Sequence, residues 1–504
     1  MPPATDPDVV EQNIKSILEW LALAHGEASP TDARTVRDYL LVLRETPLPT
    51  QQYVKILDLF YAHGLGVVSS LMPRLHDVAL PVSRKQRQSI RDVQEMLETM
   101  AQEYLNSLAE LFDPELHGKP RPPEVALWRA IRCLSAHLMI SYLSAAPSST
   151  GIWQKLHWAY HTARRLELTL RADPKEGRTI EQIYLATVLL ACCQPASFAS
   201  GEVLFLADYI RTIQDRVQVG QETPLGYGVF WIDPERDQPA SALSRRVPPP
   251  DTPVVYFRCD DIAAGAREHL DALENGYRAE NIGLPSFADT PAGHGVLRRI
   301  AERWGNPAKR RFTRRRQSYR VELCAGLDNL WQLFSFPDTE PENLSSWMIT
   351  NESPDGCAMM HMIGPTNNLR TGDIVAIRTE EDSVSEDEER GWEVCIVRWA
   401  ISENPEHIEL GIQILAPTAE PTLIAIPRDD ETPTRVSGLL LPQLPPLRQQ
   451  QMLIVPSGTL IDTTQKVMAL VRHGNLKVRE LRATQMDEQT GCVEAFSVEP
   501  DERV

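Results

Sequence analysis

The spacing of apolar residues changes part-way along the chain, and this change limits the folds available to it. Up to about Val219, apolar residues recur three or four positions apart, as in Val10, Ile14, Ile17 and Leu21. This spacing places them on one face of a helix, so we predict an all-α helical-hairpin domain over residues 1–222. Residues 153–160 resemble the first helix of a tetratricopeptide-like pair, but no fixed period repeats along the chain.

Short strand-like runs appear beyond this point, and together with the helices they predict a multidomain α+β protein. Residues 223–308 form an α+β connector, with strands predicted at 228–232 and 254–257 and helices at 262–273 and 296–304. Residues 418–504 are predicted to form a β-rich C-terminal domain. Between them, residues 309–417 contain seven predicted strands, at 319–323, 330–334, 347–350, 357–361, 374–377, 392–397 and 408–415.

The one dense basic cluster runs from Lys309 to Arg320, directly in front of the predicted strand at 319–323. A guanidinium group can form two parallel hydrogen bonds with the O6 and N7 acceptors of guanine, or with two phosphate oxygens. Two arginines close together could therefore hold an anionic guanine nucleotide. Such runs are also typical of solvated linkers that bind phosphate without specificity.

A second motif, Asn-Glu-Ser-Pro-Asp-Gly, occupies residues 351–356. The short polar side chains of Asn351 and Ser353 could hydrogen-bond the edge of a base, and Gly356 would allow close approach of the backbone or a positive φ. The same residue types also form ordinary surface turns between strands.

An Arg-x-x-x-Arg pair in front of a strand, followed by Asn-x-Ser-x-x-Gly, resembles the PilZ family, whose members bind the bacterial messenger cyclic di-GMP. The resemblance covers residues 309–417 and implies an antiparallel β-barrel with an N-terminal arginine arm. It also implies that the ligand-binding residues lie in the arm and in the second motif: Arg315, Arg316, Arg320, Asn351, Ser353 and Gly356.

Three overlapping registers of the arm satisfy Arg-x-x-x-Arg. The pair Arg316 and Arg320, with Arg315 before it, leads directly into the strand as the family pattern requires, and we favour it. The other two registers begin at Arg310 and Arg311 and end at Arg314 and Arg315. They remain alternatives.

The net charge of −18 argues against general binding to nucleic acid, because phosphate-rich partners require a positive field. The N-terminus lacks the basic and apolar regions of a signal peptide. The apolar run at 186–193 is much shorter than the ~20 residues of a membrane helix. We therefore expect a cytoplasmic protein without membrane insertion.

The sequence predicts a binding protein rather than an enzyme, with no catalytic residue, metal or cofactor, since the motifs of nucleophilic and phosphoryl-transfer catalysis are not apparent. His157 and His161 lie one helical turn apart, but their aromatic neighbours favour packing over metal ligation. The resemblance implies a cyclic di-GMP receptor, and we expect its helical domain to bind a protein partner. The alternatives are an interaction scaffold whose barrel does not bind the messenger and, less favoured, an RNA-binding arm.

Overall fold

The structure is a computed structural model. It describes residues 7–23, 28–109, 123–220, 222, 224–307, 312–341, 343–366, 368–380, 391–404, 406–428, 431–445, 448–459, 466–473 and 475–501. The chain forms two compact units. The first contains residues 1–78, 82–193 and 210–261, and the second contains residues 79–81, 194–209 and 262–504.

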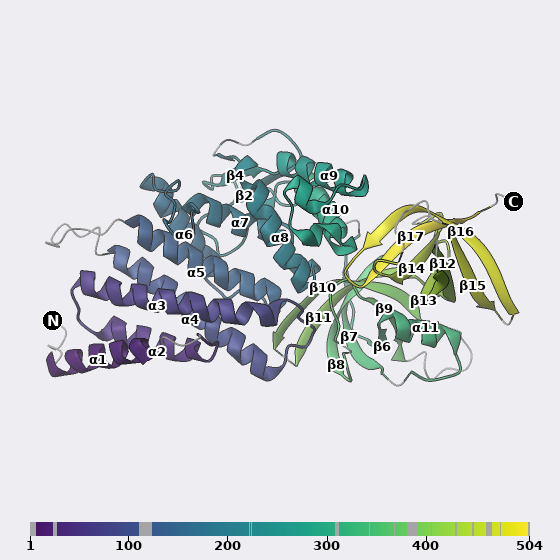
Figure 1. The fold of residues 1–504 in the computed structure, drawn as a ribbon, viewed down its shortest axis with the longest axis horizontal. Helices are drawn as coiled ribbons and strands as arrows, with labels where there is room; N and C mark the ends of the chain where they lie inside the picture. Colours follow the sequence, from purple (N-terminus) through teal and green to yellow (C-terminus); the bar gives the residue numbers. More distant parts are fainter. Residues whose placement is uncertain are drawn as a thin grey trace. The chain divides into compact units, whose positions relative to one another are not determined.

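The first unit is built from helices that pack side by side (Figure 1). Their apolar faces are those that the sequence predicts: Val36, Leu40 and Leu43, for example, are completely buried. The helices are α1 (Pro7–Leu23), α2 (Asp32–Glu45), α3 (Thr50–Leu71), α4 (Arg84–Ala109), α5 (Pro123–Leu143), α6 (Ile152–Arg165) and α7 (Ile180–Cys192). Helix α8 (Ser200–Ile213) belongs mostly to the second unit, and only residues 210–213 belong to the first.

One stretch within this unit, Gln51–Leu75, is long and apolar enough to cross a membrane by length and composition, with a mean hydropathy of 1.3. The helix α3 in this stretch packs against α2 and α4, and Leu57, Phe60 and Val67 are fully buried. The buried core helix of a soluble protein meets the same criterion, so the stretch is weak evidence for a membrane segment.

A small antiparallel sheet completes the first unit, in the order β1 (Val219–Gly220), β4 (Val255–Arg258), β2 (Val229–Ile232) and β3 (Ser241–Ala242). The loop after β2 reaches α6, where the Asp237 carboxylate accepts hydrogen bonds from Gly151 N, Trp153 N and Gln154 N at 2.5, 3.0 and 3.2 Å. A carboxylate at a helix N-terminus satisfies otherwise unpaired N–H groups. The predicted strands of the connector thus stabilise the helical unit.

The helices of the predicted connector, α9 (Asp260–Glu274) and α10 (Pro291–Gly305), lie mostly in the second unit. Helix α10 packs closely against β16 (Asn475–Gln489): a Cβ at Gly295 would lie only 1.9 Å from Gln489 O. Arg298 Nη1 also donates to Gln489 Oε1 at 3.1 Å. The two halves of the 223–308 segment therefore join different units.

The first barrel of the second unit contains seven strands in the order β5-β7-β6-β9-β10-β11-β8, with a further pairing of β7 with β8. This pairing joins the row of strands from β7 to β8 into a ring, around a core that includes the fully buried Trp347 and Ile349. The strands are β5 (Arg315–Arg316), β6 (Arg320–Ala325), β7 (Ser345–Ser353), β8 (Gly356–Ile363), β9 (Ile374–Thr379), β10 (Glu393–Asn404) and β11 (His407–Ala416).

The strand predicted at 330–334 is wrong, because this segment lies in helix α11 (Leu327–Ser335). Leu330 and Leu333 recur at helical spacing and are buried, so one face of the helix contributes to the core. Gly326 precedes the helix with a φ of +93°, a conformation that other residues rarely adopt. The Trp331 Nε1 group donates to Thr422 O at 3.0 Å and ties the helix to a strand of the C-terminal region, residues 420–428.

The β-rich C-terminal region forms a second, closed barrel in the order β12-β13-β14-β17-β16-β15. The strands not yet given are β12 (Glu420–Arg428), β13 (Glu431–Leu441), β14 (Gln451–Pro456), β15 (Lys466–His473) and β17 (Val493–Pro500). One hydrophobic cluster runs from Cys324 and Ile396 of the first barrel to Leu439 and Ile454 of the second. The two barrels therefore share a core, and the predicted α+β fold class is confirmed.

Candidate functional site

The arginine arm pairs with the strand that carries the second motif. Strand β5 runs antiparallel to β7, with Arg315 opposite Glu352 and Arg316 opposite Asn351. The chain stays against β7 as it leads to β6, because Gln317 N donates to Thr350 O at 3.3 Å and Ile349 N donates to Tyr319 O at 2.9 Å. Main-chain pairing thus brings together two motifs that are more than thirty residues apart in the sequence.

Strand β7 has a bulge between Ile349 and Asn351, where its pairing with β8 shifts by one residue. A bulge changes the face on which the following side chain lies. Here Asn351 lies on the side of the arm, and its Oδ1 accepts a hydrogen bond from Arg314 Nη1 at 3.0 Å. The bulge therefore provides the direct side-chain contact between the two motifs.

The arginines of the described part of the arm are exposed: Arg314, Arg315, Arg316 and Arg320. Within the parts of the chain that the structure describes, they form no ion pair. Their guanidinium groups are thus not held in ion pairs and remain available to an anion. Arg310 and Arg311, which begin the two alternative registers, lie outside the described residues.

Ser353 and Gly356 form the turn between β7 and β8 and lie beneath the surface. Ser353 is 8% exposed. Its hydroxyl lies 2.7 Å from Asp355 Oδ1 and 2.9 Å from Gly356 O, and it can donate its one proton to either of these acceptors. A Cβ on Gly356 would lie 2.1 Å from Ile412 O of β11. In this structure these two residues shape the turn, and Gly356 serves close approach rather than a positive φ.

Two carboxylates and a tyrosine beside the arm were not singled out in the sequence. The Tyr319 hydroxyl is hydrogen-bonded to the Glu352 carboxylate, and burial together with this negative charge raises the pKa of Tyr319. Burial and, after it, the charge of Glu352 also raise the pKa of Glu393. The alternation along 319–323 indicates that Tyr319 lies on the inner face with the buried Val321 and Leu323, but no local pattern identifies the carboxylates.

Comparison with known proteins assigns a family to the first barrel and to the helical unit. A model of the middle PilZ domain of the cyclic-di-GMP receptor FimW matches residues 337–421, which include Asn351, Ser353 and Gly356. The first barrel is a PilZ domain. A model of the N-terminal domain of the same receptor matches residues 15–223, so the predicted PilZ protein with an added helical domain is confirmed.

A curated relative extends the similarity over most of the chain. This relative, the cyclic-di-GMP receptor FimW of Pseudomonas aeruginosa, is 20% identical over an alignment of 534 positions, which covers 89% of this chain and 86% of the relative. The part of the PilZ domain matched by the family model starts after the arginine arm. The assignment of the arginine arm to the candidate site therefore rests on its pairing with β7.

The two histidines considered as metal ligands lie in the helical unit, far from the PilZ domain in sequence. His157 is completely buried, with Nδ1 2.8 Å from the Tyr184 hydroxyl and Nε2 2.9 Å from Gln238 O. Both ring nitrogens are thus satisfied by the core. Among the described residues, no group of three or more His, Cys, Asp or Glu side chains could hold a metal ion.

Burial lowers the pKa of both His137 and His157 to about 4. Their unfolded forms bind a proton near pH 6.5, so stability should fall as the pH drops from 7 towards 4, where the unfolded state binds more protons. At pH 5 the free energy of unfolding should be lower than at pH 7 by about 1–2 kcal/mol per histidine. Chemical unfolding followed by circular dichroism at pH 7 and pH 5 measures this difference. A His157→Gln variant should lose less on acidification than the native protein, and an equal loss would contradict the assignment.

Proposed function

We propose that this protein is a receptor for cyclic di-GMP, which binds between the arginine arm and the Asn-x-Ser-x-x-Gly motif of the PilZ domain. The observation that carries the proposal is the pairing of β5 with β7, which places Arg316 opposite Asn351 and beside three other exposed arginines. The named function of the relative, which this chain matches over 89% of its length, supports it.

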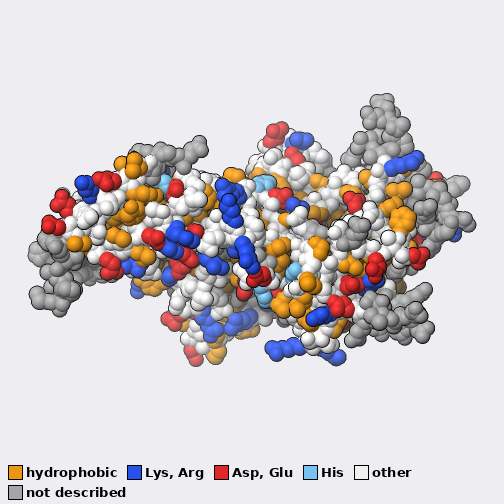
Figure 2. Space-filling model, turned by 90° about the horizontal axis from the view of Figure 1, so that it is seen from below, with side chains coloured by type: hydrophobic (Ala, Val, Ile, Leu, Met, Phe, Trp, Pro, Cys, Tyr) orange, Lys and Arg blue, Asp and Glu red, His pale blue; other side chains and the backbone are white. Residues whose placement is uncertain are grey.

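The chemistry of the arm suits a doubly charged guanine dinucleotide. Each guanidinium can hold two acceptors in parallel, either O6 and N7 of a guanine or two phosphate oxygens. We assign the principal contacts to Arg316 and Arg320, with Arg315 assisting. Acidic and basic side chains are interspersed over the face shown in Figure 2. The arm instead carries four exposed arginines that form no ion pair among the described residues, in a chain with a net charge of −18.

The motif residues differ in the roles that we assign to them. Asn351 would contact the ligand, because its amide already lies at the arm and is held there by Arg314. Ser353 and Gly356 would act through the turn that sets the position of Asn351, since the Ser353 hydroxyl bonds within that turn. The site is thus a rigid strand carrying one polar contact, next to an arm carrying several charged ones.

In the proposed mechanism, binding is coupled to a protein partner through the helical unit, in a bacterial cytoplasmic protein that performs no catalysis. The dinucleotide would neutralise the mutual repulsion of the arm's arginines and hold the arm against β7. Because the arm joins α10 to the barrel, its ordering would alter the chain just before the PilZ domain. The ligand's preference for the ordered arm sets the size of the effect.

Isothermal titration of the full chain with cyclic di-GMP tests the proposal, with GTP and a short single-stranded RNA as controls. We expect saturable binding of cyclic di-GMP alone, because of these three ligands only cyclic di-GMP holds two guanine edges and two phosphates together in one compact ring. If the titration gives no binding heat and labelled cyclic di-GMP is not displaced by the unlabelled messenger, messenger binding is refuted. The interaction scaffold is then the favoured function. Tighter binding of RNA would favour the RNA-binding alternative.

A further inference from the structure

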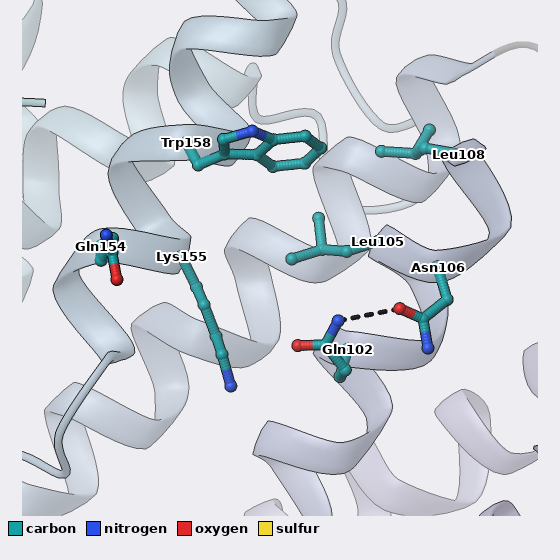
Figure 3. A pocket seen from close by; sticks show the side chains of 7 residues that line it. All are labelled: Gln102, Leu105, Asn106, Leu108, Gln154, Lys155 and Trp158. Carbon is teal, nitrogen blue, oxygen red and sulfur yellow. Dashed lines mark hydrogen bonds between the residues drawn. The ribbon is translucent and has the colours of Figure 1, made fainter. Parts of the chain in front are cut away.

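A groove in the helical unit lies between the C-terminal half of α4 and one face of α6 (Figure 3). Its volume is about 460 Å³, and the side chains along it include Leu105, Leu108 and Trp158 together with Gln102 and Asn106. Trp158 remains 46% exposed, although most large aromatic residues of this unit are buried. The groove thus combines apolar walls with amide groups that can bond a polypeptide backbone.

The charges of the two helices are unusual for a chain with a net charge of −18. Helix α6 contains no Asp or Glu, and Arg165 at its end is exposed without an ion pair in the described part of the chain. Each carboxylate of α4 forms an ion pair: Asp92 with Arg34, Glu95 with Arg37, Glu98 with Lys155 at 2.8 Å, and Glu103 with Arg44. The acids of α4 are thus neutralised, and α6 carries Arg165, a cation unpaired among the described residues, two turns beyond the groove residue Trp158.

The spacing along α6 places this cation on the same helix face as Trp158, which lines the groove. Gln154, Trp158, His161 and Arg165 are separated by four, three and four residues, which places them on one face of the helix. Burial and the two following arginines lower the pKa of His161, so the ring is mostly neutral. Trp158 and Arg165 then provide an aromatic contact and a positive charge two turns apart.

We propose that this groove binds an acidic amphipathic helix of a partner protein. The partner would place a leucine or phenylalanine beside Trp158 and Leu105, and its carboxylates beside Arg165. Exposed tryptophans in grooves are frequent centres of binding energy, and amphipathic helices commonly bind in such grooves. An acidic segment would be repelled by the general field of this chain and accepted at this place, which provides specificity. The inference deepens the proposed function, whose partner it describes.

Selection of displayed helical peptides on the immobilised full-length protein tests the proposal. We expect enriched sequences to carry apolar residues three and four apart with Asp and Glu between them. A synthetic peptide of the most enriched sequence should bind about tenfold or more weakly to Trp158→Ala and to Arg165→Glu. The matched control is Tyr227→Ala, since Tyr227 is an aromatic residue of the same unit that is 81% exposed and lies outside the groove. The affinity of this variant for the peptide should equal that of the native protein.

Three outcomes would overturn the inference. In the first, the enriched peptides are basic. In the second, they bind Trp158→Ala with the same affinity as the native protein. In the third, sedimentation shows a dimer that Trp158→Ala abolishes, which would make a second copy of this chain the occupant. Melting temperatures equal to that of the native protein would show that the variants are folded. The selection contains no messenger and the titration contains no peptide, so failure of one proposal is distinguishable from failure of the other.

Discussion

Replacing Arg316 or Arg320 with alanine is expected to weaken cyclic di-GMP binding by about ten- to a hundredfold each. Each change removes a bidentate charged contact, which contributes about 1.5–3 kcal/mol. Neither side chain forms an ion pair in the described part of the chain, and both are exposed, so the loss should occur without unfolding. Isothermal titration of each variant measures the affinity, and thermal melting checks the fold.

Other arginine variants separate this expectation from a general charge effect and from the alternative registers. Arg435→Ala removes an exposed arginine of β13 in the second barrel and should leave the affinity unchanged. Arg310→Ala and Arg314→Ala test another register. If these two lose binding while Arg316→Ala and Arg320→Ala retain it, the arm uses the register that ends at Arg314.

Replacing Gly356 with valine is expected to destabilise the PilZ domain by about 3 kcal/mol or more and to abolish messenger binding. A Cβ at this position would lie 2.1 Å from Ile412 O and 3.0 Å from Gln413 Cα, both backbone atoms of the paired strand β11. Strand β8 would have to move away from β11, and the turn that positions Asn351 would move with it. Denaturant unfolding and titration of the same preparation measure both effects.

Gly391→Ala is the matched control, because a Cβ there would meet only Pro417 O at 3.8 Å, an ordinary contact. It should change the free energy of unfolding by less than about 1 kcal/mol, as expected for an unhindered surface change. A Gly356→Val protein as stable as this control would contradict the close packing of β8 on β11.

The domain boundaries show how far local patterns extend. The helical domain predicted at 1–222 and the connector predicted at 223–308 follow a change in composition. In the structure, the sheet of β2, β3 and β4 instead joins the helices, where Asp237 caps α6, while α9 and α10 lie mostly with the barrels. A capping contact between residues more than eighty positions apart leaves no periodic signal in the sequence.

Helix α11 illustrates an ambiguity within a local pattern. The run at 330–334 is apolar enough for a short strand, and periodicity alone does not separate a short strand from a buried helix. Its assignment as a helix depends on the shared core, where Leu330 and Leu333 pack between the two barrels. The surrounding β-structure in the sequence favoured the wrong choice.

The sequence by itself determined the helical first part, the β-rich remainder and the two PilZ motifs, because apolar spacing and short polar signatures are local properties of the chain. Tertiary structure alone decided how the motifs meet. The pairing of Arg316 with Asn351 and the bulge that directs Asn351 towards Arg314 arise from strand register. The burial of Ser353, the position of Glu352 beside Tyr319 and the groove between α4 and α6 also depend on partners distant in the chain. Register and burial are set by the summed packing of whole strands and helices, which no short segment encodes.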